Sequence, residues 1–341
     1  LGKVLDKMDA CNMWDDTMLI VNTDHGYMLG EKEWWSKTVM PVYNEIANTP
    51  FFCWDPRSKV SGVHRQALMQ TIDIAPTLLE FFSVDIPKDM QGHSIAPIIE
   101  DDTPVREHAL FGYHGGQINI TDGKYVYMKG PVSAANRPLF EYTLMPAHMR
   151  SMFKVQELQQ TVMAPPFSFT KGCPVMKIAA TSLLPSFNYG DKLFDLETDP
   201  DQEQPLDNLG IEAAMLEGLR KGLLACDAPP DEFARLGIPE AGPVDVSAVQ
   251  GIREQRVQAE RVSVLEDLEW ERSAVHQFTM LLQLTPVEDR AGLERGFCRF
   301  IEQAAVGRVT SAQLLAFADA VIPPKQKGLV QYLLGLSGRL Y

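Results

Sequence analysis

The sequence has few cysteines and no paired ones. It contains five, Cys11, Cys53, Cys173, Cys226 and Cys298, and no two of them form a Cys-x-x-Cys pair. An odd number of scattered cysteines argues against both a zinc site and a disulfide framework. We therefore expect buried free thiols, which favour a reducing compartment such as the cytoplasm.

The sequence also lacks long apolar runs and an excess of positive charge. No apolar stretch approaches the roughly 18 residues that a transmembrane helix needs, and we expect no secretory signal peptide. The formal net charge is −14 at pH 7, so nucleic acid would be repelled rather than bound through counterion release. The mixed, acidic charge likewise excludes anchoring on an anionic membrane. A small anionic substrate stays compatible, because local cations can override the net field.

The first third of the chain has the pattern of α/β layering. With 341 residues, 45% of them hydrophobic, the chain can form one large or two ordinary domains. A helical apolar stripe over residues 1–8 precedes "TMLIVNT" at 17–23, whose uniformly apolar character is typical of a strand covered on both faces. A second extended run at 49–56 and a helix over 71–84 follow. We expect residues 1–105 to form part of an α/β core.

The pattern changes after residue 105. Segments 108–116, 117–129 and 192–200 are typical of antiparallel strands, and Asp122-Gly123 suits a tight hairpin turn. We expect a small antiparallel-sheet subdomain over 106–227, with an irregular insertion at 131–190. The proline-rich segment 228–245 predicts a linker. Residues 246–341 predict an all-helical tail, through which two copies of the chain could associate.

The stretch "VNTDHGYMLGEKEWWSK" at 21–37 is the first candidate for a functional site. If the strand ends there, a turn at Gly26 would let Asp24 and His25 reach one ion. A carboxylate and an imidazole suit a divalent cation, and Lys37 would bring a positive charge to an anionic oxygen. The alternative is an ordinary turn with a local Asx hydrogen bond and a solvated lysine. The tripeptide alone does not decide between the two.

Several motifs in one order resemble the sulfatase family. The stretch just quoted follows a helix and an acidic turn, as in sulfatases. Then "NTPFFCWDP", "TIDIAPTLLEFFSVDIPKDMQGHSIAPII" and "KLFDLETDPDQEQPLDN" are similar to the family's next strand, its helix with the following loop, and its late signature. The resemblance covers roughly residues 1–227. It implies part of an alkaline-phosphatase-like α/β sandwich, a small antiparallel α+β subdomain, and a helical tail outside the resemblance.

The resemblance also implies a metal-dependent sulfuric ester hydrolase. Asp24 and His25 would belong to the metal site, most simply for Ca2+, and Lys37 would bind the sulfate, so that His25 and Lys37 would be the catalytic residues of this segment. The family's nucleophile is a hydrated formylglycine, made from Cys or Ser, that attacks sulfur while the metal and lysines stabilise charge. The substrate would be a sulfate ester of a small anionic molecule or a carbohydrate.

The family's nucleophile motif is missing. It reads Cys/Ser-x-Pro-x-Arg and lies far upstream with an acidic pair, but only 23 residues precede Asp24 and they contain neither. The segment "GCPVMK" at 172–177 lacks the arginine. The chain therefore resembles a C-terminal portion, and we expect no turnover from it alone. Two alternatives are a phosphonate monoester or phosphodiester hydrolase of the same superfamily, using Mn2+, and a non-catalytic interaction protein with a sulfatase-like shell.

A few further residues are candidates for the substrate pocket. His114 stands beside two glycines, which allow a ligand to approach the backbone closely. Within the insertion, Arg137, His148 and Arg150 could line a pocket for an anionic substrate, unless this Met- and aromatic-rich segment is only a packing loop. His93 lies in a "QGHSI" loop that the family uses structurally.

Overall fold

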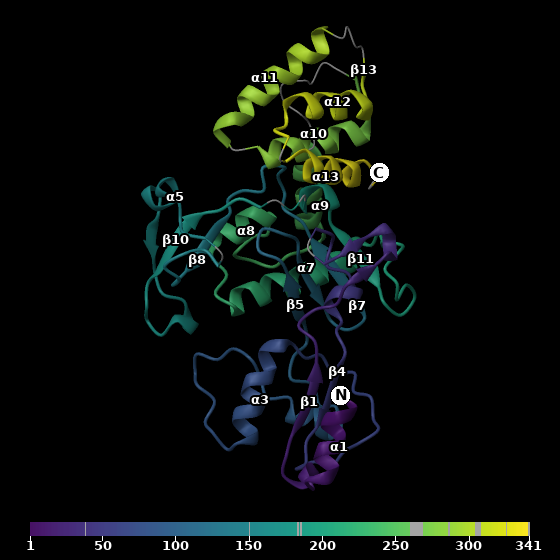
Figure 1. Cartoon of the computed structure of the whole chain (residues 1–341), viewed down its shortest axis with the longest axis vertical. Coiled ribbons are helices and arrows are strands. Elements are labelled where there is room, and N and C mark those ends of the chain that lie inside the picture. The colour runs from purple at the N-terminus through teal and green to yellow at the C-terminus, as the bar shows by residue number, and fades with distance from the viewer. Residues whose placement is uncertain are drawn as a thin grey trace.

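The chain is arranged in three groups of elements along its longest axis. In this computed structural model the N-terminal elements lie at one end, an antiparallel sheet with the helices of residues 209–259 lies in the middle, and the helices after residue 271 lie at the other end (Figure 1). Within the described part of the chain, no helix is both long and apolar enough to cross a membrane. The structure describes residues 1–37, 39–149, 151–182, 184, 186–259, 269–285, 287–303, 308–324 and 326–339.

The N-terminal group is built on a two-stranded antiparallel ribbon. Strand β1 (Leu19–Asn22) pairs with β4 (Phe51–Trp54). Among the described residues each strand has one neighbour, and Leu19 to Val21 are only half-buried. The prediction of a strand covered on both faces is therefore wrong, because the described residues add no further strand to this ribbon. Three helices belong to this group: α1 (Gly2–Ala10), α3 (Ile74–Phe81) and α4 (Ala96–Asp101).

The middle sheet has four antiparallel strands in the order β11-β7-β6-β5. Its strands lie where the sequence predicted them. Gly123 has a φ of 95°, and the Asp122 carboxylate accepts the backbone N–H groups of Lys124 and Tyr125 at 2.9 and 2.7 Å. These contacts close the predicted hairpin between β6 and β7. The strands are β5 (Ala109–Gly112), β6 (Ile118–Thr121), β7 (Tyr125–Lys129) and β11 (Lys192–Asp195).

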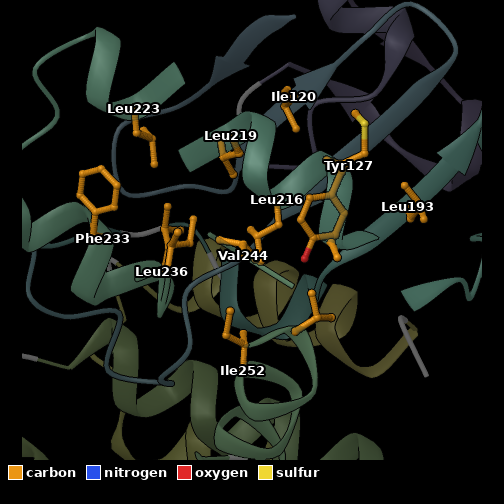
Figure 2. Packing of buried hydrophobic residues seen from close by; sticks show 14 of the residues in the cluster. Ile120, Tyr127, Leu193, Leu216, Leu219, Leu223, Phe233, Leu236, Val244 and Ile252 are labelled. Carbon is orange, nitrogen blue, oxygen red and sulfur yellow. The ribbon is translucent and has the colours of Figure 1, made fainter. Parts of the chain in front are cut away.

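The predicted linker at 228–245 is part of the main hydrophobic core. It contains helix α8 (Pro230–Leu236), whose Phe233 and Leu236 lie in one cluster with Leu216 and Leu219 of α7 (Leu209–Ala225) (Figure 2). The linker prediction is wrong because proline also suits the first position of a helix, which Pro230 occupies. Helix α9 (Val246–Ala259) adds Ile252 to the same cluster. It therefore packs with the sheet rather than with the last helices.

Buried charges join this sheet to α9. Lys129 and Asp191 form an ion pair with 2.9 Å between Nζ and Oδ2, and the Lys129 side chain is fully buried. Arg256 of α9 donates to the carbonyl of Phe187 at 2.7 Å and lies over its ring. The charged network thus fixes how the helix lies on the sheet.

The predicted irregular insertion at 131–190 contains a second sheet, of three antiparallel strands in the order β8-β10-β9. The prediction is wrong because these strands are short and pair with segments far apart in the sequence, which local patterns do not reveal. The strands are β8 (Phe140–Thr143), β9 (Val162–Ala164) and β10 (Val175–Ala179), and the helices are α5 (Val155–Gln159) and α6 (Ser186–Tyr189).

The C-terminal group has an aromatic core of its own. Phe278 stacks on Phe297 with 4.7 Å between ring centres, and Phe317 meets Phe297 edge-on at 5.0 Å. Val39, two residues after Lys37, packs against this core. The group is not all-helical, because β12 (Glu269–Trp270) pairs in parallel with β13 (Arg308–Val309). That it joins two copies of the chain stays a prediction. Its helices are α10 (Arg272–Leu284), α11 (Val287–Gln303), α12 (Ser311–Val321) and α13 (Lys327–Arg339).

Candidate functional site

The residues of the predicted site lie on the segment that follows β1 and packs against the middle sheet. After β1 the chain passes through the Asp-His-Gly tripeptide into a hairpin of β2 (Met28–Leu29) and β3 (Trp35–Ser36). Met28 and Trp34 are buried in one cluster with Val126 and Phe194 of the sheet. This packing holds the hairpin in place, and therefore also the residues just before and after it, His25 and Lys37.

A glycine is needed at position 26 because another backbone lies against it. A Cβ at Gly26 would stand 1.8 Å from the carbonyl oxygen of Glu45, and the Gly26 N–H donates to the carbonyl of Ile46 at 2.9 Å. Both partners belong to helix α2 (Asn44–Ala47). Gly26 does not have a positive φ, so the turn does not depend on glycine's freedom to adopt that conformation, which would have been the ordinary reason for a glycine here. What the turn requires is the absence of a side chain.

The imidazole of His25 is the meeting point of the predicted site residues. Its Nδ1 lies 2.9 Å from the carbonyl oxygen of Gly26. Because a carbonyl only accepts, Nδ1 carries the proton and Nε2 keeps its lone pair. Lys37 Nζ contacts this Nε2, and Asp24 Oδ2 lies 3.3 Å from it. Proteins commonly prepare a metal-binding histidine in this way, with one ring nitrogen bonded to a carbonyl.

The Asp24 carboxylate faces solvent next to that lone pair. Its side chain is 83% exposed, and it accepts the backbone N–H of His25 at 3.0 Å. Desolvation acts to raise the pKa of Asp24, but His25, nearby backbone N–H groups and Lys37 together outweigh it and lower the pKa. A carboxylate and a nitrogen lone pair at this distance favour a cation between them, and the ammonium of Lys37 is the cation that approaches here.

The donor types fit a divalent cation, but this chain contributes too few donors to fill its coordination shell. Ca2+ takes six to eight oxygen ligands. Within the described ranges, no three or more His, Cys, Asp and Glu side chains are grouped so that they could hold a metal ion. Asp24 and His25 would therefore hold one side of the ion, and the other ligands would have to come from elsewhere.

The turn after β5 brings a tyrosine and the predicted His114 close to this segment. The hydroxyl of Tyr113 donates to the backbone carbonyl of Lys37. His114 Nε2 lies 3.0 Å from the carbonyl oxygen of Phe140 on β8, so the ring is turned toward the insertion. The sequence did not single out Tyr113, because a tyrosine next to a strand is ordinary and its partner is distant in the chain.

This turn is held in place by a buried arginine. Arg235 of α8 donates to the carbonyl of Gly116 at 3.0 Å and to Asn136 Oδ1 at 2.9 Å. Asn136 in turn donates to the carbonyl of Gly115 at 2.8 Å. Gly115 has a φ of 70° and its missing Cβ would clash with Ser182. The segment expected to be a linker thus positions the candidate substrate turn.

The other candidates do not gather at the site. His148 lies 3.2 Å from both Glu141 and Glu157, so acidic groups engage the ring that was expected to meet an anion. Arg137 lies on a small cavity next to α10, and Arg150 lies outside the described residues. All five cysteines are free, as predicted, but none is buried.

A cavity of about 720 Å3 that the sequence did not predict lies beside His114. It lies between the turn after β5, the strands β8 and β10, and the junction of α7 with α8. Its volume falls in the range of small-molecule sites. Tyr113 lines it as well, so it adjoins the Lys37 segment. No local motif could reveal it, because its walls come from four segments of the chain. We call it the insertion cavity.

Part of this chain is similar in sequence to sulfatases. Residues 30–125 match the family described as N-sulphoglucosamine sulphohydrolase, C-terminal. An N-acetylglucosamine-6-O-sulfatase of Bacteroides thetaiotaomicron is 31% identical over 118 residues, 33% of this chain and 21% of that protein. An arylsulfatase of Clostridium perfringens is 28% identical over 117 residues, 33% and 24% respectively. The multifunctional alkaline phosphatase superfamily protein PehA of Trinickia caryophylli is 30% identical over 106 residues, 30% and 20% respectively.

Among solved structures, that of BT4656 in complex with its substrate D-glucosamine-2-N,6-O-disulfate has a TM-score of 0.45 and 16% identity, over 68% of this chain and 39% of that chain. The parts of the curated relatives that align with this chain span about a fifth to a quarter of their lengths. The predicted resemblance to the sulfatase family, in its C-terminal portion, is therefore confirmed over about a third of the chain.

Proposed function

We propose that this chain is the C-terminal part of a metal-dependent sulfuric ester hydrolase, with Asp24, His25 and Lys37 as its contribution to the active site. The observation that carries the proposal is the meeting of these three side chains at His25 Nε2. Similarity to a carbohydrate sulfatase and to an arylsulfatase supports the reaction class. The substrate would be a sulfate ester of a carbohydrate or of another small molecule.

In this proposal Asp24 and His25 bind the divalent cation and Lys37 binds the sulfate. The bound cation would stabilise negative charge on the transferred group. Lys37 now occupies the place beside Nε2 that a cation would take, so its ammonium would turn to a sulfate oxygen. Tyr113 holds the backbone of Lys37, and therefore only the lysine side chain would have to move.

The nucleophile and the remaining ligands would belong to polypeptide that this sequence does not contain. Neither Cys-x-Pro-x-Arg nor Ser-x-Pro-x-Arg occurs in the 341 residues. In the described structure β1 and β4 have unpaired outer edges, and Phe52 on β4 is 66% exposed. Free strand edges beside exposed aromatic rings favour the addition of further strands.

A second candidate is hydrolysis of a phosphonate monoester or phosphodiester with Mn2+. The observation that favours it is the nitrogen donor of His25, which suits a transition metal better than it suits Ca2+. The similarity to PehA, a protein named for the alkaline phosphatase superfamily, is compatible with either candidate. The two candidates share the site residues and differ in the preferred ion and ester.

Replacing Lys37 with alanine should weaken the binding of 4-nitrophenyl sulfate by about 10- to 100-fold, because a charge-assisted hydrogen bond contributes about 1.5–3 kcal/mol. Calorimetric titration in the presence of Ca2+ measures this without turnover. Lys3→Ala, which removes an exposed lysine of α1, is the control and should keep the original affinity. An unchanged affinity in Lys37→Ala would contradict the proposal. Tighter binding of phenylphosphonate with Mn2+ would favour the second candidate.

A further inference from the structure

The insertion cavity has aromatic walls. Phe140 and Tyr142 of β8 line it together with Phe167 and Phe169 from the segment before β10. The rings of Phe167 and Phe169 stack with their centres 5.4 Å apart and their planes within 10°, and Tyr142 meets Phe167 edge-on at 5.4 Å. Such a stack presents flat apolar faces, on which another ring can pack favourably.

The acidic groups on the cavity wall are already engaged by the protein. Asp231 accepts from Lys177 Nζ at 2.6 Å and from the hydroxyl of Tyr142. Asp227 accepts the backbone N–H of Ser168 at 2.7 Å. Asp231 is therefore charge-paired within the wall, and one oxygen of Asp227 is engaged by the backbone.

The other polar groups of the wall are engaged in the same way. Glu232 is paired with Arg235, with 2.9 Å between Oε2 and Nε. The hydroxyl of Thr170 donates within its own turn, and that of Thr143 accepts the backbone N–H of Met145 at 2.8 Å. A sugar ring would bury several hydroxyl groups here without partners, and each such group is costly. An apolar ring carries no such cost.

His114 leaves one polar contact for a ligand. Its Nε2 must carry the proton, because its partner at 3.0 Å is the carbonyl oxygen of Phe140. In the neutral ring Nδ1 is then an acceptor. A phenol, the alcohol that hydrolysis of an aryl sulfate ester releases, would donate its hydroxyl to this acceptor and place its apolar ring against the phenylalanines.

We infer that the insertion cavity binds an aromatic ring, and that this ring is the organic half of a sulfate ester whose sulfate lies at Lys37. The second part rests on the proposed function. Tyr113 connects the two places, because it lines the cavity and its hydroxyl donates to the carbonyl of Lys37. The substrate class that follows is an aryl sulfate ester rather than a sulfated sugar alone.

Fluorescence titration of the full chain with 2-naphthol tests the cavity. We expect saturable one-to-one binding, weakened about 5- to 10-fold in Phe169→Ala. Phe169 is 45% exposed, so its removal should leave the fold intact, which a thermal melt verifies. Leu144→Ala, another exposed wall position, gives an independent second variant. Phe52→Ala is the matched control, because it removes an exposed phenylalanine outside the cavity. Non-saturable binding overturns the inference. So does equal affinity in the wild type and both wall variants, or tighter binding of N-acetylglucosamine than of 2-naphthol.

The same titration with 2-naphthyl sulfate separates this inference from the proposed function. With Ca2+ present, the sulfate ester should bind at least 10-fold more tightly than 2-naphthol, and Lys37→Ala should remove this advantage. If the advantage persists in Lys37→Ala while Phe169→Ala still weakens 2-naphthol, the cavity binds the ring and the proposed role of Lys37 is wrong. If 2-naphthol fails to bind but the ester still depends on Lys37, the cavity inference alone is overturned.

Discussion

Replacing Asp191 with alanine is expected to lower the free energy of unfolding by about 3–5 kcal/mol, because Lys129 would be left as an unpaired buried charge. The Lys129 side chain is fully buried, with its Nζ 2.9 Å from Asp191 Oδ2. Asp191 also accepts the backbone N–H of Gly130 at 2.7 Å. Chemical denaturation at pH 7 measures the loss.

The pKa of Asp191 fixes the pH at which this comparison should be made. Burial by itself raises it, but Lys129 and Arg256 outweigh the burial and the pKa is lowered. A carboxyl group whose folded-state pKa is depressed contributes stability above its unfolded pKa of about 3.9, and that stability is lost as the pH falls toward the folded value. The effect of Asp191→Ala should therefore be full at neutral pH and shrink in acid.

Two further variants separate the buried pair from ion pairs in general. Glu197→Ala breaks the exposed pair between Lys124 and Glu197 and should cost no more than about 1 kcal/mol. The double variant Lys129→Met/Asp191→Leu replaces both charges by apolar groups and should recover much of the loss. A cost of Asp191→Ala as small as that of Glu197→Ala would show that the pair is not buried in solution.

Gly26→Ala is expected to destabilise the N-terminal part of the chain and to displace the site. The new Cβ would stand 1.8 Å from the carbonyl oxygen of Glu45, so one of two backbones must move. Overpacking of this kind typically costs about 1–3 kcal/mol. The hydrogen bond from His25 Nδ1 to the carbonyl of Gly26 would shift with it, so the His25 tautomer should no longer be fixed. Denaturation and the NMR signals of the His25 ring report the two effects.

Gly2→Ala is the matched control for this substitution. A Cβ at Gly2 meets no atom within 4 Å, and the residue begins helix α1. Alanine there should be neutral or slightly stabilising, because it favours the helix. If Gly26→Ala behaves like Gly2→Ala, the close packing of α2 on the turn is wrong.

The sequence could predict contacts between residues that are close together in the chain, but not contacts between distant segments. Asp24, His25 and Lys37 lie on one short segment, so a strand end and a hairpin suffice to bring them together. The hairpin at Asp122-Gly123 was equally local. By contrast, Tyr113 reaches Lys37 only through the folded sheet. The meeting of these three side chains was therefore predictable from the sequence, whereas the contact with Tyr113 was not.

The errors have physical causes of the same kind. Prolines predicted a linker at 228–245, but Pro230 begins a helix and Phe233 is buried under α7. The strands β8 and β10 pair across the length of the insertion, so neither has a local partner that a pattern could reveal. The walls of the insertion cavity come from these strands and from the start of α8. The cavity could therefore not be predicted while both of these segments were predicted wrongly.

Binding of a divalent cation at His25 tests the central claim most directly. Two-dimensional NMR of the imidazole nitrogens should show Nδ1 protonated and Nε2 free of a proton in the isolated chain. Titration with Ca2+ should shift the Nε2 signal, and trace Mn2+ should broaden it before the signals of the other histidines. Asp24→Ala should abolish both effects, whereas Asp15→Ala, which removes a similarly exposed acid, should leave them unchanged. A His25 signal that neither ion affects, or that responds equally in Asp24→Ala, would contradict the assignment of this segment as a metal and sulfate site.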